Sequence, residues 1–244
     1  MTILVNLLCL LLYVALGVSL WWLPWAQLSP AIVLALTLCG IFLADVISGL
    51  LHVFLDYFPL NRKAGIDRLY FFSGRRDTAE FRDLKSAVFA QCSVTDKISY
   101  NFKIHHLKPK YMNRKSYSFQ VLDTVVPAGV LALLSFLLPP AAALCAIVVS
   151  FFVANTQFIH ACIHDTDKSV IWKKVVQAMQ RMHIVYSFAA HMEHHRYGQT
   201  NFCLITGWGN IVVNPLSALL FRHGVLSRDY WEQLRRLPGT PGNA

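Results

Sequence analysis

The ten histidines of the chain stand in short groups whose spacing is that of metal ligands on helices. His160 and His164 are four residues apart, and His191, His194 and His195 follow an i, i+3, i+4 pattern, so each group would lie on one helix face. The further candidates are His52, the adjacent pair His105 and His106, and His183. Neutral imidazole is the commonest metal ligand in proteins, so this pattern predicts a metal site.

Two aspartates accompany His52 on the same apolar segment. Asp56 follows this histidine by four residues and Asp45 precedes it by seven, which places all three on one helix face. A carboxylate within an apolar segment is costly to bury without a partner and usually marks a functional site. We therefore treat Asp45 and Asp56 as candidate catalytic residues, with a simple interfacial position as the alternative for Asp56.

The number and type of these ligands distinguish between metals. A structural zinc needs four ligands and a catalytic zinc three, and HMEHH (191–195) has neither of the spacings of the zinc peptidase helices. Nine candidate histidines with a few carboxylates favour two non-haem irons. Beside a lipid bilayer, two irons predict activation of O2 and oxidation of an unactivated C–H bond of an alkyl or acyl chain. The six cysteines have no CxxC spacing and predict neither a disulfide framework nor a thiolate site.

The elements that must position these residues are apolar helices. The 244-residue chain is 55% hydrophobic and only 14% charged, with a mean hydropathy of +0.45, which is typical of a membrane protein. Four segments are long enough to cross a hydrocarbon core of about 30 Å. They cover residues 3–24, 30–56, 120–138 and 141–164. Short uncharged connections join them in pairs, so the sequence predicts an all-α, multi-pass integral membrane protein with two helical hairpins.

The basic residues indicate how these spans are oriented. All 22 Lys and Arg residues lie within 56–120 and 165–244. Under the positive-inside rule, both segments and the N-terminus are predicted to be cytoplasmic. All histidine groups then meet on that side, in a helical cap that carries the metal site, with residues 169–195 as one amphipathic helix at the membrane surface. The charge is expected to face anionic lipid or an acidic partner, and its distribution argues against nucleic acid.

Five motifs resemble those of the lipid desaturase family that contains plasmanylethanolamine desaturase, its relative in bacterial carotenogenesis and the plastid phosphatidylglycerol palmitate desaturase. They are ADVISGLLHVFLD (44–56), FKIHHLKP (102–109), QFIHACIH (157–164), HIVYSFAAHMEHH (183–195) and NFCLITGWGN (201–210). The resemblance covers about residues 40–215. It implies a membrane-bound lipid desaturase domain over residues 1–215, followed by a C-terminal tail over 216–244.

The resemblance also implies a di-iron enzyme that uses O2 and takes electrons from a cytochrome- or ferredoxin-type donor. Carried over residue by residue, its metal ligands are His52, His105, His106, His160, His164, His183, His191, His194 and His195. Asp45 and Asp56 would act beside these ligands. The implied substrate is a phospholipid chain, as in plasmalogen biosynthesis. Gln199 and Lys115 stand where the ether-lipid branch has histidines, so ether-linked alkyl and ester-linked acyl chains are both left open.

Other functions are left open by the residues themselves. A hydroxylase uses similar histidines and differs only in its product. A zinc-dependent lipid hydrolase would hold zinc and would be indifferent to O2. A non-catalytic metal carrier would spread its ligands through the depth of the spans, whereas 3–24 and 120–138 contain no histidine. The Gly-rich segment TGWGN (206–210) is expected either to end the ligand helix or to pack Trp208 against the site or the lipid.

Overall fold

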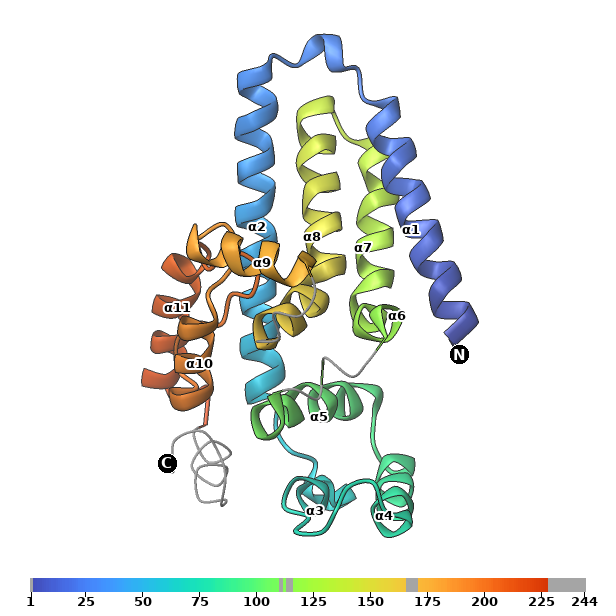
Figure 1. Cartoon of the computed structure of the whole chain (residues 1–244), viewed down its shortest axis with the longest axis vertical. Helices are drawn as coiled ribbons and strands as arrows, with labels where there is room; N and C mark the ends of the chain where they lie inside the picture. Colours follow the sequence, from blue (N-terminus) through green and yellow to red (C-terminus); the bar gives the residue numbers. More distant parts are fainter. Residues whose placement is uncertain (1, 110–111, 113–115, 166–170, 228–244) are drawn as a thin grey trace.

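The computed structural model describes residues 2–109, 112, 116–165 and 171–227, and every regular element within these ranges is a helix. Four apolar helices form a bundle: α1 (Thr2–Trp22), α2 (Pro30–Tyr57), α7 (Leu122–Leu134) and α8 (Pro140–His164). Figure 1 shows them side by side in the order α2, α8, α7, α1. Both α2 and α8 begin with proline, whose fixed φ suits the first turn of a helix.

The two predicted hairpins are present, but the second is inserted into the first. The helices α1 and α2 are joined through η1 (Trp25–Gln27), yet α7 and α8 lie between them (Figure 1). The helices α7 and α8 are joined through η4 (Ser135–Leu137) and pack directly on one another. Hydroxyl groups link them, because Thr124 donates to the Ala154 carbonyl at 2.9 Å. This insertion brings the end of α2 that carries His52 beside the end of α8 that carries His160.

Three helices are long and apolar enough to cross a membrane: Ile3–Trp22, Pro30–Tyr57 and Pro140–His164. The fourth predicted span, 120–138, is shorter than expected, because its apolar helix covers only Leu122–Leu137. The chain before it forms a separate short helix, α6 (Tyr117–Gln120), and Val121 lies between the two. The structure is thus that of a membrane protein with three candidate spans and a shorter apolar helix packed among them.

A cap of three helices lies at the end of the bundle opposite η1 and η4 (Figure 1). From here on, the word cap means residues 61–109 only, a smaller region than the histidine-bearing cap that the sequence predicts. These residues contain α3 (Ile66–Tyr70), α4 (Ala79–Ala90) and α5 (Val94–Leu107). The cap has its own core, in which Tyr70, Phe81 and Tyr100 are buried. Helix α5 starts with a capping box between Ser93 and Asp96, lies across the end of the bundle and contacts α2.

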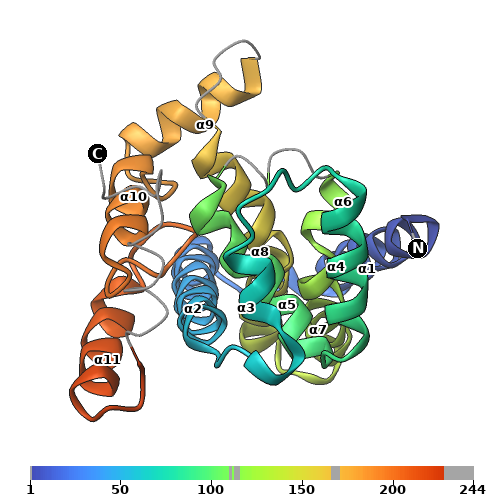
Figure 2. The same ribbon diagram turned by 90° about the horizontal axis from the view of Figure 1, so that it is seen from below.

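The remaining helices lie in a row along the other side of α2 (Figure 2). They are α9 (Ile171–Arg181), α10 (Phe188–Tyr197) and α11 (Asn210–Arg222). The single helix predicted over 169–195 is wrong, because the Tyr186 N–H donates to the Ile205 carbonyl at 2.9 Å and Ser187 starts a new helix. Helix α11 continues through the predicted boundary at 215, and residues 228–244 of the predicted tail lie outside the described part of the chain.

Candidate metal centre

Eight of the nine predicted histidines meet in one buried region where α2, α5, α8 and α10 come together. With Asp56 they form two groups, and the ligand atoms within each group all lie within 4.8 Å of one another. The five-histidine group consists of His105, His160, His164, His191 and His195. The Asp56 group consists of His52, Asp56, His106 and His194. Every one of these side chains belongs to a residue that is at most 4% exposed.

Two of the three long helices, α2 and α8, each supply one pair of candidate ligands. Helix α2 places His52 and Asp56, four residues apart, in the Asp56 group, and α8 places His160 and His164 in the five-histidine group. Residues separated by four positions lie on the same face of a helix, so each pair points the same way. As the spacing predicts, the two side chains of each pair lie on one helix face and enter the same group.

Helices α5 and α10 instead contribute to both groups and so place them side by side. Adjacent residues on a helix point roughly 100° apart, so neighbouring histidines reach different centres. His105 joins the five-histidine group while His106 joins the Asp56 group, with 4.1 Å between their ring centroids. On α10, His194 reaches the Asp56 group, whereas His191 and His195 reach the other. One helix thus serves both groups, which explains the crowding of imidazoles at 191–195.

Four imidazoles of the five-histidine group, those of His160, His164, His191 and His195, converge through their Nε2 atoms. The Nε2 atom of His191 lies 2.8 Å from that of His160, 2.9 Å from that of His164 and 3.1 Å from that of His195. Metal–nitrogen bonds of about 2.1 Å place neighbouring ligand nitrogens about 3 Å apart. Lone pairs on so many converging nitrogens repel one another unless protons or a cation lie between them. The arrangement therefore fits a bound metal ion.

The Asp56 group surrounds one carboxylate with three imidazoles. Asp56 Oδ2 lies 3.2 Å from His52 Nε2 and 3.1 Å from His194 Nε2, and Oδ1 lies 2.9 Å from His106 Nε2. The carboxylate adds a negative charge that a set of neutral imidazoles lacks. A donor set of imidazoles with one carboxylate suits a divalent transition metal such as iron.

Backbone carbonyls orient three of the rings. His52 Nδ1 donates to the Phe202 carbonyl and His194 Nδ1 to the Thr200 carbonyl, both at 2.8 Å, and His105 donates to the Phe102 carbonyl. Because a carbonyl oxygen can only accept, the proton lies on Nδ1, and Nε2 keeps a lone pair directed into the group. Sequence reasoning missed these contacts, because main-chain carbonyls carry no side-chain signal.

Burial also keeps His105, His191 and His195 in the ligand form. Burial lowers the pKa of His105, His191 and His195 well below the ordinary 6.5, and neighbouring imidazoles lower it further. Burial lowers the pKa of His106 as well, although the Asp56 carboxylate opposes the shift. His105, His191 and His195 are therefore neutral at physiological pH, with nitrogen lone pairs available to a metal.

His183 is the one predicted ligand that the structure keeps apart. It is exposed in the segment after α9, where it has a left-handed φ of 57°, and it belongs to neither group. Trp208 is 46% exposed, so its ring does not pack into the metal centre.

Asp45 lies outside both ligand groups and holds the segment 202–210 against α2. Its carboxylate accepts hydrogen bonds from the N–H groups of Ile205, Thr206 and Gly209 at 2.8, 3.2 and 2.9 Å. It also accepts one from the Thr206 hydroxyl at 2.9 Å. The same segment supplies the Phe202 carbonyl that orients His52. The geometry is therefore that of a residue that positions the ligands, at a distance from the metal centre.

We expect Asp45→Ala to lower the free energy of unfolding by about 3 kcal/mol or more, because several buried N–H groups lose their acceptor. Thermal unfolding of the detergent-purified protein measures this loss as a lower Tm. Asp83→Ala, which removes an exposed carboxylate from α4, is the control and should leave the Tm unchanged. Equal Tm values for the two variants would contradict the role that we assign to Asp45.

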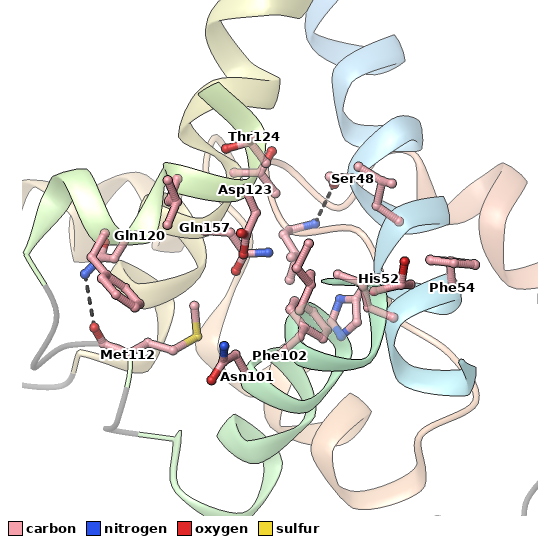
Figure 3. A pocket seen from close by; sticks show the side chains of 18 residues that line it. Ser48, His52, Phe54, Asn101, Phe102, Met112, Gln120, Asp123, Thr124 and Gln157 are labelled. Carbon is pink, nitrogen blue, oxygen red and sulfur yellow. Dashed lines mark hydrogen bonds between the residues drawn. The ribbon is translucent and has the colours of Figure 1, made fainter. Parts of the chain in front are cut away.

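A cavity of about 320 Å³ adjoins the metal centre between α2, α5, α7 and α8 (Figure 3). His52 and Phe102 line the cavity on the side of the candidate ligands, and their ring centroids are 4.9 Å apart. Gln157 also lines the cavity, and its Oε1 atom is 3.4 Å from His160 Nδ1. Leu51 and Phe54 form part of its wall and are exposed on α2, at 44% and 51%. The cavity thus extends from the candidate ligands to the apolar surface of a membrane-competent helix.

Buried imidazole groups at the ends of membrane-competent helices define a membrane protein with a histidine-rich site for metal. The family model of the lipid desaturase domain matches residues 90–223, more than half of the chain. The chain therefore belongs to the lipid desaturase domain family, whose members are oxidoreductases that act on lipids. Asp45, His52 and Asp56 precede the matched region. No curated protein matches the chain, and no solved structure matches it.

Proposed function

We propose that this protein is an O2-dependent di-iron lipid desaturase, similar to plasmanylethanolamine desaturase, that introduces a double bond into an alkyl or acyl chain of a phospholipid. The observation that carries the proposal is the pair of adjacent, buried ligand groups, one of five imidazoles and one of three imidazoles with a carboxylate. A catalytic zinc needs only three protein ligands. Two neighbouring groups of this size favour a pair of irons over a zinc hydrolase.

The chemistry of the proposed reaction explains why it needs a metal centre. Two hydrogens leave neighbouring carbons as the double bond forms, and O2 is reduced to two waters with two electrons and two protons from a donor. When bound, iron supplies the oxidising power toward an unactivated C–H bond that no side-chain acid or base provides.

The residues of this chain would hold the metals and shield them from water. The five-histidine group would bind one iron and the Asp56 group the other. Phe202 packs on His194 with 4.8 Å between ring centroids and on His52 with 5.7 Å, so aromatic side chains cover the ligand rings. Exclusion of water from this region would protect a reactive centre from side reactions.

The cavity beside His52 is the proposed position of the reacting lipid chain. Its α2 wall is apolar and exposed at Leu51 and Phe54, so a chain in the bilayer would reach the ligands without crossing water. Its opposite wall carries the polar side chains of Gln120, Asp123 and Gln157 (Figure 3), which would contact the more polar part of the lipid. We further propose that the metal centre and the N-terminus face the cytoplasm, as the distribution of Lys and Arg predicts.

Elemental analysis of detergent-purified protein, with iron and zinc measured together, is the first test. We expect about two irons per chain, since the structure offers two ligand groups of the size that metal sites use. One zinc without iron would overturn the proposal in favour of hydrolysis.

Lipid mass spectrometry of cells that express the protein, with and without O2, then tests the reaction. A loss of two hydrogens from ether or ester phospholipids supports desaturation, whereas a gain of one oxygen indicates a hydroxylase.

A further inference from the structure

A small basic pocket lies on the cap, between α4, α5 and the loop that precedes α4. It has a volume of about 220 Å³. Its charged side chains are Arg76, Arg82, Lys85 and Lys108, and Tyr100 and Ile104 of α5 form part of its wall. We call this site the basic pocket. The whole cap is positive, because residues 61–109 contain ten Lys and Arg against five Asp and Glu.

Among the described residues, no cation of the basic pocket forms a salt bridge with a carboxylate, although Arg82 and Lys108 lie close enough to the Asp77 carboxylate to lower its pKa. Arg76 donates to the Tyr70 carbonyl at 2.7 Å and to the Tyr100 hydroxyl at 3.2 Å, and Arg82 donates to the Asp77 carbonyl at 2.9 Å. The Asp77 carboxylate is bound by Arg75 through hydrogen bonds of 3.1 and 2.7 Å. Because this carboxylate is already bound by Arg75, it balances the four cations only in part, and the pocket keeps positive charge for an external partner.

Two like charges, those of Lys85 and Arg76, lie close together in this pocket. The Lys85 ammonium lies 4.9 Å from the ring centroid of Phe89 and 5.5 Å from that of Tyr100. Burial and the neighbouring Arg76 lower the pKa of Lys85. A negative partner would relieve this repulsion, so the site favours an acidic ligand.

The basic pocket and the metal centre lie on different faces of the same helix. Ile104 of α5 lines the pocket, whereas His105 and His106 of α5 point into the two ligand groups. The angular step of a helix turns these histidines roughly 100° and 200° away from Ile104. Because a helix with its side chains is about 10–12 Å wide, little more than α5 separates the pocket from the ligands.

The pocket also lies on the side of α5 that is away from the membrane-competent helices. Figure 1 shows α4 beyond α5, at the far end of the molecule from η1 and η4. A lipid headgroup would be expected nearer to the ends of α1, α2 and α8. A soluble protein can reach this face of the cap directly.

We infer that the basic pocket is the docking site of an acidic electron-carrier protein, which delivers electrons across α5 to the metal centre. This inference rests on the proposed function, because reduction of O2 during desaturation consumes two electrons from outside the chain. Charge complementarity selects the partner and speeds its association. The short path through α5 then makes this face of the cap the one from which an electron reaches His105 and His106.

Binding of a small acidic ferredoxin to the purified protein in neutral-lipid nanodiscs tests the docking site. Biolayer interferometry gives the Kd at an ionic strength of about 0.01 M, where the Debye length is about 30 Å. We expect the double variant Arg82→Glu/Lys85→Glu to raise this Kd by about tenfold or more, because it reverses two charges at the interface. Lys108→Glu changes a side chain that is exposed at the end of α5, and it should also raise the Kd. This variant replaces Arg82→Glu/Lys85→Glu in the test if the double variant does not fold.

The double variant Arg62→Glu/Lys63→Glu is the matched control. It changes the charge of the cap by the same amount at exposed positions outside the pocket, and its Kd should stay within about twofold of that of the unchanged protein. Equal weakening in both double variants would show a general effect of charge and would overturn the docking site. If Arg82→Glu/Lys85→Glu leaves ferredoxin binding unchanged and reduces binding to vesicles of anionic phosphatidylglycerol, the docking site is overturned in favour of a lipid site.

Electron transfer separates this inference from the proposed function. In stopped-flow experiments, oxidation of reduced ferredoxin by the iron-loaded protein should slow by about tenfold in Arg82→Glu/Lys85→Glu. Reduction of the same variant by dithionite should proceed at the unchanged rate, because this small reductant needs no docking site. Slowing with both reductants would overturn the docking site. A protein that binds ferredoxin but contains no iron would contradict the proposed function alone.

Discussion

Replacing His191 with alanine is expected to reduce lipid desaturation by more than about 100-fold, because even the partners of metal ligands cost 10–100-fold when they are removed. The Nε2 atom of His191 lies within 3.1 Å of three other imidazoles, which places this side chain at the centre of the five-histidine group. The variant should also lose about one of its two irons, since the Asp56 group keeps all of its own ligands. Desaturated lipid and iron content, measured on the same preparation, check the two results.

His223→Ala is the matched control for this variant. His223 is exposed at the end of α11 and belongs to neither ligand group, so its loss should leave both the activity and the iron content unchanged. Size-exclusion chromatography distinguishes loss of metal from loss of fold. Full activity in a folded His191→Ala protein would refute the assignment of the five-histidine group.

Replacing Asp56 with alanine should reduce lipid desaturation as much as His191→Ala does, but it should remove the iron of the Asp56 group. Asp56 contacts three imidazoles through its two oxygens and is fully buried. Its removal takes the negative charge from the Asp56 group and leaves only three imidazoles, which weakens the binding of a divalent ion in that group. We expect about one iron per chain and a loss of activity of more than about 100-fold.

The combined variant His191→Ala/Asp56→Ala separates two sites from one shared site. If each group binds its own iron, the single variants should each keep about one iron and the combined variant should keep none. Asp83→Ala, with its carboxylate exposed on α4, controls for the loss of an acidic residue. An unchanged iron content in the folded Asp56→Ala protein would show that this carboxylate is not a ligand.

Most of the helical content, and most of the side chains that meet in the candidate metal centre, could be predicted from the sequence. Apolar residues mark the three long helices over most of their length, and the spacing of His160 and His164 places both on one face of α8. These are local properties, because a helix repeats every 3.6 residues whatever surrounds it. The family motifs add specificity at the same positions, and the family match includes seven of the eight histidines that converge.

The division of the ligands into two groups could not be predicted in this way. Nothing in the doublet of His105 and His106 states that one ring joins five imidazoles and the other joins Asp56. That division depends on where α5 and α10 lie relative to α2 and α8, and so on packing between distant parts of the chain. The insertion of one hairpin into the other has the same origin.

Asp45 and Asp56 show where local patterns end. Both stand on α2, and the sequence left a simple interfacial position open for Asp56 alone, yet it is Asp56 that joins the imidazoles. The structure separates them because Asp45 meets the N–H groups of Ile205 and Gly209, more than 150 residues away, whereas Asp56 meets three imidazoles. By itself the sequence determined the helices, their apolar faces and the types of the candidate ligands. Only the tertiary structure decided which buried groups become partners, because hydrogen bonds and metal ligands are chosen by distance in space.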